Sequence, residues 1–338
     1  PWIESSSVHL HLVNATQAGG LALADKLTIS GRLLGTRLIG NALFVVTTYA
    51  PRLPVDLLPP TAPASEREAA LAQLTNNDVL PTLRVNSAAP QPLLPDTDCY
   101  VQAKNASLGI EITTITTIDL ASATPAPQSR CIVGGSEAFY MSAQSLVLAT
   151  TRYAYTGGEA AWRYPVEITT DLHKFNLAAA GPAYRGSGSV KGHLGWDHKA
   201  KSYRISEHNG DLRVLSFTGE MGWGILADAA SKPASPATLT VLRERATDQS
   251  LQPIATLPNA QRPAPLGQPG EQIYAVRFLG DRAYLVTFRQ IDPLYVLDLA
   301  DPADPKAVGE LKVTGFSDCL LPLRDGLLFG VGRQASDN

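Results

Sequence analysis

The fold is decided by residues 271–313, which read EQIYAVRFLGDRAYLVTFRQIDPLYVLDLADPADPKAVGELKV. Two apolar runs rich in β-branched and aromatic residues are joined by the tight-turn pair Gly280-Asp281, and a third run leads through a Pro-rich turn into a fourth. Short runs of this composition with turn residues between them are typical of antiparallel strands. The stretch therefore predicts four strands, which we designate A to D: Ile273–Leu279, Ala283–Phe288, Leu294–Leu299 and Ala307–Val313.

The same order of strands recurs along the chain with decreasing fidelity. Strand B is found again at Leu43–Thr47 and Leu146–Thr150, and more loosely at Leu212–Leu215. A four-stranded unit that repeats in this way buries its faces against its neighbours, as the blades of a β-propeller do. We therefore predict an all-β chain built as a β-propeller of four-stranded antiparallel blades. Strand C is found again at Thr113–Leu120, Asp171–Leu177 and Ala237–Leu242.

Each end of the chain carries half of this unit. Val8–Val13 and Leu21–Ile29 align with strands C and D, and Cys319–Leu323 and Leu327–Val331 align with A and B. The chain would thus hold four complete blades and two half blades. The halves either join into one blade that closes a five-bladed ring, or stay apart because the chain is a fragment of a larger propeller. We favour the fragment, because an unsealed edge strand invites further pairing, and we treat residues 1–338 as one propeller domain.

One insertion interrupts the pattern between strands B and C of the first complete blade. It spans residues 51–108 and begins with a Pro-rich segment. Ser65 and Glu68 have the spacing of a capping box, so a helix is expected there, packed down by Leu71 and Leu74. An insertion of this length commonly caps one face of a repeat fold or carries its function.

The composition argues against two classes of partner. Only 17% of the 338 residues are charged, the net charge is −3, and no basic cluster could neutralise the phosphates of a nucleic acid or bind an anionic membrane surface. No apolar run is long enough to span a bilayer as a helix. Gly and Pro number 27 and 25, as expected for many short strands joined by turns.

The three cysteines allow at most one intrachain disulfide. Cys99 lies in the insertion, and Cys131 lies in strand D of the same blade. A bridge between them would staple the insertion to its blade, contribute roughly 2–4 kcal/mol and require an oxidising compartment. The alternative is that all three cysteines are small buried side chains. Cys319 falls on an expected inner strand and is predicted to be free, buried and inert.

Several stretches resemble a family of secreted β-propeller domains from bacteria and archaea. The most specific is YAVRFLGDRAYLVTFRQIDPLYVLDL, within Glu271–Pro302, and the similarity extends over nearly the whole chain. Gly195–Arg204 (GWDHKAKSYR) departs from it, since the family usually carries an Asn-Gln-Phe-Ser run there. The resemblance implies a propeller fold, an extracytoplasmic location and relatives that are longer at both ends, but it implies no activity. The other stretches that carry it are residues 170–192, Glu207–Val214 and Val308–Pro322.

No catalytic or metal-binding group of residues is identified. His9 and His11 share one face of a strand, but no third ligand accompanies them. His193, Asp197 and His198 lie between a strand D and the next strand A, where we expect a solvated loop, with a cation site as the alternative. The Gly-Ser-Gly-Ser run at 186–189 lacks the pattern of a phosphate loop or a nucleophile elbow. We therefore predict no catalytic residue and no metal site, and the sequence identifies no cofactor.

Arginine recurs at one position of the blade. Arg37 and Arg277 stand at the same interval before the aromatic residue of strand B, and Arg204 stands one residue further from the start of its strand B. Tyr140 takes this position in the blade of Cys131. Because the innermost strands of a propeller surround its channel, these side chains are expected to approach a common axis.

Two interpretations of these arginines follow. In the first, each arginine pairs with a carboxylate such as Glu207 or Asp281, or with backbone carbonyls, and locks neighbouring blades together. In the second, the arginines leave donors free to bind a carboxylate, phosphate or sulfate. We predict an extracytoplasmic scaffold that binds an anionic small molecule or a protein partner without catalysis. The alternative is an enzyme, a hydrolase, lyase or oxidoreductase, whose active site at the channel mouth holds an anionic substrate with the same arginines.

Overall fold

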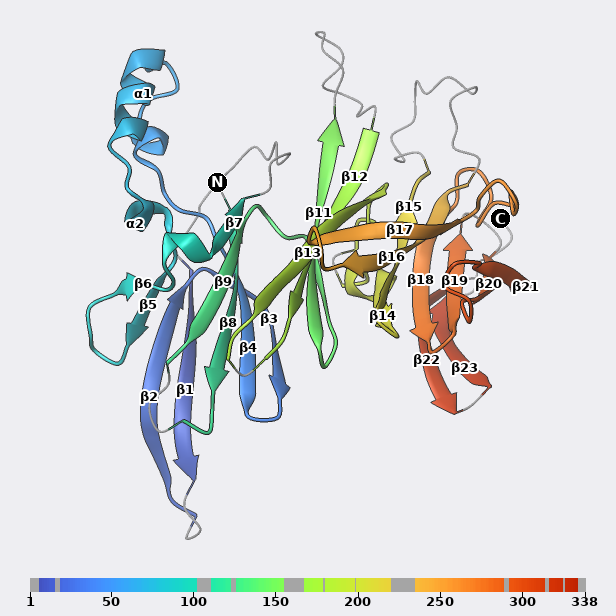
Figure 1. Cartoon of the computed structure of the whole chain (residues 1–338), viewed down its shortest axis with the longest axis horizontal. Coiled ribbons are helices and arrows are strands. Elements are labelled where there is room, and N and C mark those ends of the chain that lie inside the picture. The colour runs from blue at the N-terminus through green and yellow to red at the C-terminus, as the bar shows by residue number, and fades with distance from the viewer. Residues whose placement is uncertain are drawn as a thin grey trace. The chain divides into compact units, whose positions relative to one another are not determined.

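Strands dominate the computed structural model, and the all-β class predicted from the sequence is confirmed. The chain divides into two compact units, Pro1–Ser136 with Asn176–Ala183, and Glu137–Phe175 with Tyr184–Asn338 (Figure 1). No described helix is long and apolar enough to cross a membrane. The structure describes residues 6–15, 19–101, 111–122, 126–154, 167–178, 180–197, 199–219, 235–288, 292–313, 316–324 and 326–333.

The first unit contains two sheets, with strand orders β1-β2-β5-β6 and β3-β4-β8-β9-β7. Apolar residues from both sheets, among them Ile29, Ile112 and Cys131, form one buried cluster, which holds the sheets together. The strands are β1 (Ser7–Ala15), β2 (Leu21–Ser30), β3 (Arg32–Ile39), β4 (Ala42–Tyr49), β5 (Thr82–Val85), β6 (Gln91–Pro92), β7 (Cys99–Val101), β8 (Ile112–Asp119) and β9 (Gln128–Val133).

The residues between β4 and β8 contribute to both of these sheets. β5 and β6 extend the sheet of β1 and β2, whereas β7 pairs with β9 in parallel. Leu93 and Leu94 add to the cluster between the sheets. Residues 102–108 of the predicted insertion lie outside the described residues.

The predicted helix of this segment forms as α1 (Ala64–Ala72) and stands clear of the strands (Figure 1). The capping box expected at Ser65 was wrong, because the N-cap residue is Pro63 and no side chain caps the helix. Leu71 is exposed, so it does not pack α1 down; Arg67 instead donates to the carbonyls of the Pro-rich segment that precedes α1. The remaining helical turns are η1 (Pro54–Leu57), α2 (Asn76–Val79) and η2 (Asp96–Asp98).

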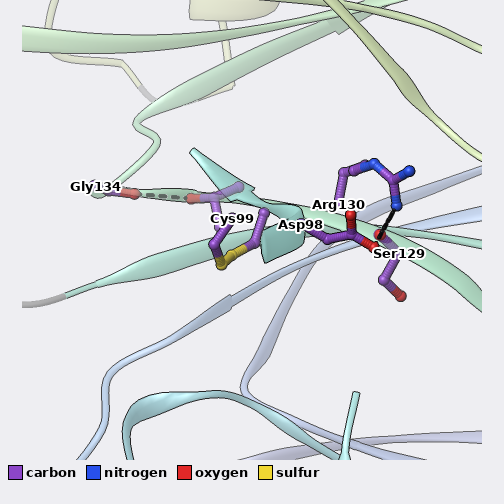
Figure 2. The surroundings of a disulfide bond; sticks show 7 residues. Asp98, Cys99, Ser129, Arg130 and Gly134 are labelled. Carbon is purple, nitrogen blue, oxygen red and sulfur yellow. Dashed lines mark hydrogen bonds and ion pairs between the residues drawn. A yellow bond between two sulfur atoms is a disulfide. The ribbon is translucent and has the colours of Figure 1, made fainter. Parts of the chain in front are cut away.

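A disulfide joins Cys99 to Cys131, as predicted (Figure 2). The two residues are direct partners in the β7–β9 ladder, and their Cα atoms are 4.4 Å apart, within the range that a bridge tolerates. Beside the bridge, Arg130 forms an ion pair of 2.7 Å with Asp98 and also donates to the carbonyl of Ser129. The covalent bond thus fixes β7, the edge strand of the sheet, to β9.

The second unit begins with an eight-stranded sheet of order β10-β11-β12-β13-β17-β16-β15-β14. Its two halves meet where β13 and β17 run in parallel, at Ser187 and Ser250. A Cβ atom on Gly186 or Gly188 would lie within 2.5 Å of backbone atoms of β17 or the residue before it, so the Gly-Ser-Gly-Ser run serves this close approach. The strands are β10 (Ala138–Met141), β11 (Ser145–Ala154), β12 (Glu167–Asn176), β13 (Ala183–Lys191), β14 (Ile205–His208), β15 (Asp211–Phe217), β16 (Ala237–Arg245) and β17 (Ser250–Leu257).

Residues 271–313 form a four-stranded antiparallel sheet of order β18-β19-β20-β21. Buried residues of β18 and β19 pack against those of β15 and β16, including Leu215 and Val241, so consecutive four-stranded groups bury their faces against each other. This is the packing expected of propeller blades. The strands are β18 (Gln272–Leu279), β19 (Arg282–Phe288), β20 (Asp292–Asp298) and β21 (Lys306–Val313).

The last two strands, β22 (Phe316–Arg324) and β23 (Leu327–Arg333), form a two-stranded sheet. Cys319 is free, as predicted, but it is exposed, so its predicted burial was wrong. Side chains alternate along a strand, and on β22 the neighbouring Leu320 takes the buried face, where it packs against Ala275 and Val286.

Candidate functional site

The connection between β13 and β14 folds back under the strands that follow it. Gly192 has a φ of +83°, and a Cβ atom there would lie 2.1 Å from the carbonyl oxygen of Phe217. Gly195 has a φ of +78°, and its Cβ would lie 2.0 Å from Nη1 of Arg204. Both positions need glycine because the backbone conformation is left-handed and the space is filled. The connection then ends in the 3-10 helix η4 (Lys201–Arg204), which leads into β14.

Arg204 is buried at the end of this connection, with only 4% of its surface exposed. Its Nη1 donates to the carbonyl of Leu194 and its Nη2 to the carbonyl of Ile273, each at 2.7 Å. Nε is buried without a hydrogen-bond partner. Among the described residues, no carboxylate lies within ion-pair distance of this guanidinium. Burial lowers the pKa of Arg204 to about 10, so it remains charged at neutral pH.

His193 lies beside Arg204 and is 2% exposed. The rings of Trp196 and Phe217 flank its imidazole, each with a centroid distance of 5.0 Å. The backbone N–H of Gly195 donates to Nδ1 at 2.9 Å, whereas Nε2 is buried without a partner. Burial lowers the pKa of His193 to about 4, and the charges of Arg204 and Lys201 add to this effect. The predicted solvated loop was therefore wrong for His193.

A cavity of about 460 Å³ lies at these two side chains. Its apolar lining comes from Trp196, Phe217, Ile273 and Tyr274. A cavity of this size that combines aromatic with polar and charged side chains has the character of a small-molecule site. The polar lining comes from His193, Asp197, Arg204, Gln272 and Arg333.

The three arginines singled out from the sequence have different surroundings. Arg37 is exposed on β3 in the first unit, opposite Phe44. Arg277 is half-buried on β18, where its guanidinium lies 5.6 Å from the ring centre of Tyr203 and its Nε has no partner. Of these three, only Arg204 lines the cavity, and its carbonyl partner Ile273 lies on β18, the first strand of the following sheet.

The predicted equivalence of Arg204 with the other two arginines was wrong. Arg204 lies on η4, ahead of β14, and the residue of β14 that matches Arg277 in register is Ser206. The interval between Arg204 and its strand B is one residue longer than for the other two arginines, and this difference concealed that Arg204 precedes β14. Arg213 of β15 is the residue opposite Ser206; it donates to Ser206 and to the carbonyl of Gly280 and lies over the ring of Phe278.

The other predicted site residues lie outside the cavity lining. Tyr140 is opposite Val147 on β10 and packs against a buried apolar cluster. Asp281 is exposed in the β18–β19 turn and pairs with His208 at 3.0 Å. Glu207 accepts from Lys174 at 2.7 Å and from two serine hydroxyls. Burial alone would raise the pKa of Glu207, but these donors lower it overall.

The described residues contain no group of three side chains suited to hold a metal ion. Among them, His9 bonds to Thr28 on the neighbouring strand. Asp197 accepts from the backbone N–H of Lys199 at 2.9 Å and closes a turn. His198 lies outside the described residues.

Comparison with known proteins gives the family. The chain is 35% identical over 148 residues to an uncharacterized protein of Methanocaldococcus jannaschii, a match that covers 44% of this chain and 20% of that protein. It is 56% identical over 64 residues to an uncharacterized protein of Archaeoglobus fulgidus, covering 19% and 10%. The matched segments thus span a fifth and a tenth of these relatives.

Among solved structures, an acylaminoacyl peptidase of Pyrococcus horikoshii matches 90% of this chain and 52% of its own, with a TM-score of 0.25 and 10% identity, too low to support an argument. The family model described as a β-propeller domain matches residues 2–338. The chain therefore belongs to the β-propeller domain family, as its sequence resemblance implied.

Proposed function

We propose that this chain is a propeller scaffold that binds a small anionic ligand, without catalysis, in the cavity beside Arg204. One observation carries the proposal: a charged, buried guanidinium lines a cavity and has no carboxylate partner among the described residues. Removing a guanidinium from water is costly unless an opposite charge or carbonyls replace the water. The two carbonyls satisfy part of this demand, and a bound anion would satisfy the rest.

The chemistry around the cavity favours binding over the alternative of an enzyme. A general base works best when its pKa lies near the operating pH. His193, with a pKa of about 4, is a weak base at neutral pH. The carboxylate of Glu207 is held by Lys174 and two serines and does not line the cavity.

The disulfide supports an extracytoplasmic location, because such bonds persist in oxidising compartments. We also propose that the sheets correspond to four complete blades and two half blades. Residues 1–338 would then form one incomplete propeller with an insertion at residues 51–108, and the sheet orders support this assignment.

Thermal denaturation in acetate, phenylacetate, phosphate or sulfate at constant ionic strength tests the proposed function. A ligand that binds only the folded state raises its stability, so at least one anion should raise the melting temperature of the parent. Arg204→Lys should lose this shift, whereas Arg213→Lys, a change at an equally buried arginine outside the cavity lining, should keep it.

Two results would contradict the proposal: no anion stabilises the parent, or Arg213→Lys loses the shift as completely as Arg204→Lys. If Arg204→Lys does not fold, calorimetric titration of the parent and of Trp196→Ala replaces it. Trp196 is 54% exposed and lines the cavity, so its truncation leaves the core intact.

A further inference from the structure

Exposed side chains from three segments line the cavity beside the buried Arg204. They are Trp196 and Asp197 on the connection after β13, Gln272 at the start of β18 and Arg333 at the end of β23. Because these four side chains are exposed, a ligand in the cavity can contact them directly, whereas Arg204 is 4% exposed and acts on a ligand through its charge. The exposed groups therefore define which ligand fits.

The polar groups among them require both donors and acceptors on the ligand. The carboxylate of Asp197 only accepts hydrogen bonds, the guanidinium of Arg333 only donates them, and the amide of Gln272 does both. None of the ion pairs formed within the described part of the chain involves Arg333. A matching ligand therefore carries an acidic group for Arg333 and hydroxyl groups that donate to Asp197.

The charge of the lining favours one negative charge on the ligand. Arg204 and Arg333 carry two positive charges and Asp197 carries one negative charge. His193 is neutral at pH 7, mainly because burial lowers its pKa to about 4. One positive charge is left over, which a single carboxylate neutralises in a charge-assisted hydrogen bond to an arginine.

Trp196 adds a flat apolar surface to this polar lining. It exposes 54% of its surface and lines the cavity. A pyranose ring has C–H groups on its faces and hydroxyl groups around its rim, so one face can cover an indole while the hydroxyl groups meet polar side chains. An aromatic acid would also cover the indole, but it would leave Asp197 and Gln272 without hydrogen-bond partners. A cavity of about 460 Å³ has room for one sugar ring.

We propose that the cavity binds a hexuronate, a pyranose with one carboxylate, whose carboxylate accepts from the guanidinium of Arg333 and whose ring covers Trp196. Its hydroxyl groups donate to the carboxylate of Asp197 and to the amide oxygen of Gln272. The inference rests on the proposed function, which requires only an anion in this cavity, and adds the chemical class of the ligand. Glucuronate is the probe that carries all of these groups.

Calorimetric titration at pH 7 and constant ionic strength tests this class with four probes: glucuronate, glucose, phenylacetate and phosphate. Glucuronate should bind at least about tenfold more tightly than glucose, which lacks the charge. It should exceed phenylacetate, which has a ring and a carboxylate but no hydroxyl groups, by a similar factor. Phosphate has no ring to cover the indole and should also bind more weakly than glucuronate.

Two variants with matched controls place the ligand in the cavity. Arg333→Gln should reduce glucuronate affinity about tenfold and leave the weaker glucose affinity unchanged, whereas Arg324→Gln, at an exposed arginine that ends β22 and does not line the cavity, should change neither. Trp196→Ala should reduce the affinity for both sugars. Tyr203→Ala is its control, because Tyr203 is 53% exposed on the same connection but does not line the cavity.

The outcomes separate the two proposals. Binding of phenylacetate or phosphate as tight as that of glucuronate would overturn the hexuronate and leave the anion site standing. Equal affinity for glucuronate and glucose would overturn the role of the carboxylate. Equal losses in a variant and its control would overturn the place of the carboxylate at Arg333 or of the ring at Trp196. If none of the four probes binds, both proposals fail.

Discussion

Arg204 and Arg213 are both 4% exposed, and each leaves Nε without a hydrogen-bond partner. Their surroundings differ. The guanidinium of Arg213 is 5.0 Å from the ring centre of Phe278, which accommodates its charge, whereas Arg204 lines a cavity. The proposed binding role of Arg204 therefore rests on the cavity that it lines and not on its burial.

Gly195→Ala should disturb the cavity through contact with Arg204. The new Cβ would lie 2.0 Å from Nη1, and the guanidinium is held by two carbonyls, so at least one hydrogen bond must break. Gly210→Ala is the control, because φ is +86° there but no atom lies within 4 Å of the Cβ. We expect Gly195→Ala to lower the free energy of unfolding by roughly 1–3 kcal/mol more than the control in urea denaturation. Equal losses would show that only backbone strain matters.

His193 should make stability depend on pH. Its pKa is about 4 in the folded protein and near 6.5 when unfolded, so between these values only the unfolded chain takes up the proton. Stability from this residue is complete above pH 6.5 and falls as the pH falls towards 4, by on the order of 3 kcal/mol. Comparing the parent with His193→Gln by urea denaturation from pH 7 to 4.5 isolates this effect. The same pH dependence of the unfolding free energy in both proteins would contradict this role of His193.

The sequence indicated three residues of the candidate site but not the surroundings of the two that are buried. His193, Asp197 and Arg204 were all singled out, the first two as a solvated loop and the third as an inner-strand arginine. The burial of His193 and Arg204 depends on Gly192 and Gly195, whose left-handed backbone folds the connection back on itself. No periodic pattern encodes such a fold, so spacing alone could not reveal it.

At the scale of elements, the disulfide and the exposed Cys319 predict different numbers of reactive thiols in the native protein and in the reduced, denatured protein. Reaction of the native protein with Ellman's reagent should titrate one thiol, since Cys319 is exposed and Cys99 and Cys131 are bridged. Full reduction and denaturation should release three. No reactive thiol in the native protein would show that Cys319 is buried, and three would exclude the bridge.

The bridge should also stabilise the element it holds. Replacing both Cys99 and Cys131 with alanine should lower the free energy of unfolding by roughly 2–4 kcal/mol, because the unfolded chain regains the freedom of the 32 residues that separate them. Chemical denaturation of the variant and of the oxidised parent measures the difference. Identical unfolding midpoints of the variant and the oxidised parent would show that the bridge does not stabilise the protein.

The strands of residues 272–313 were predicted because their signal is local: apolar runs separated by turn residues. The capping box at Ser65 was not borne out, since the Pro-rich segment fixes the start of α1 earlier. The parallel addition of β7 to β9 was also missed in its details, because a three-residue strand has no periodicity to read.

At the scale of the whole molecule, ion pairs between strands of the eight-stranded sheet support the apolar packing. Lys174 on β12 is bound to Glu207 on β14 at 2.7 Å and to Glu244 on β16 at 3.2 Å, and its side chain is 8% exposed. Lys174→Met would leave two carboxylates without this charge and should cost roughly 3–5 kcal/mol in denaturation. Arg130→Met, at a more exposed pair, should cost at most about 1 kcal/mol. Equal losses of unfolding free energy in the two variants would show that the buried ion pairs of Lys174 contribute no more than the exposed pair of Arg130.

The repeated strand pattern is visible in the sequence because each copy is a local run of residues, whereas the cavity is built from segments that are not neighbours in the chain. Its lining comes from the connection after β13, the last residue of β15, the first residues of β18 and the last residue of β23, segments far apart in the chain. Only the packing of successive sheets brings them together.

The central claim is that a small anion binds in the cavity beside Arg204. The most direct measurement is the proton–nitrogen NMR signal of the arginine Nε groups during titration with phenylacetate, with Arg204 and Arg213 assigned from their lysine variants. Arg204 should shift saturably while Arg213, equally buried but outside the cavity lining, stays in place. An unmoved Arg204 signal at saturating phenylacetate, or equal shifts of both signals, would contradict the account.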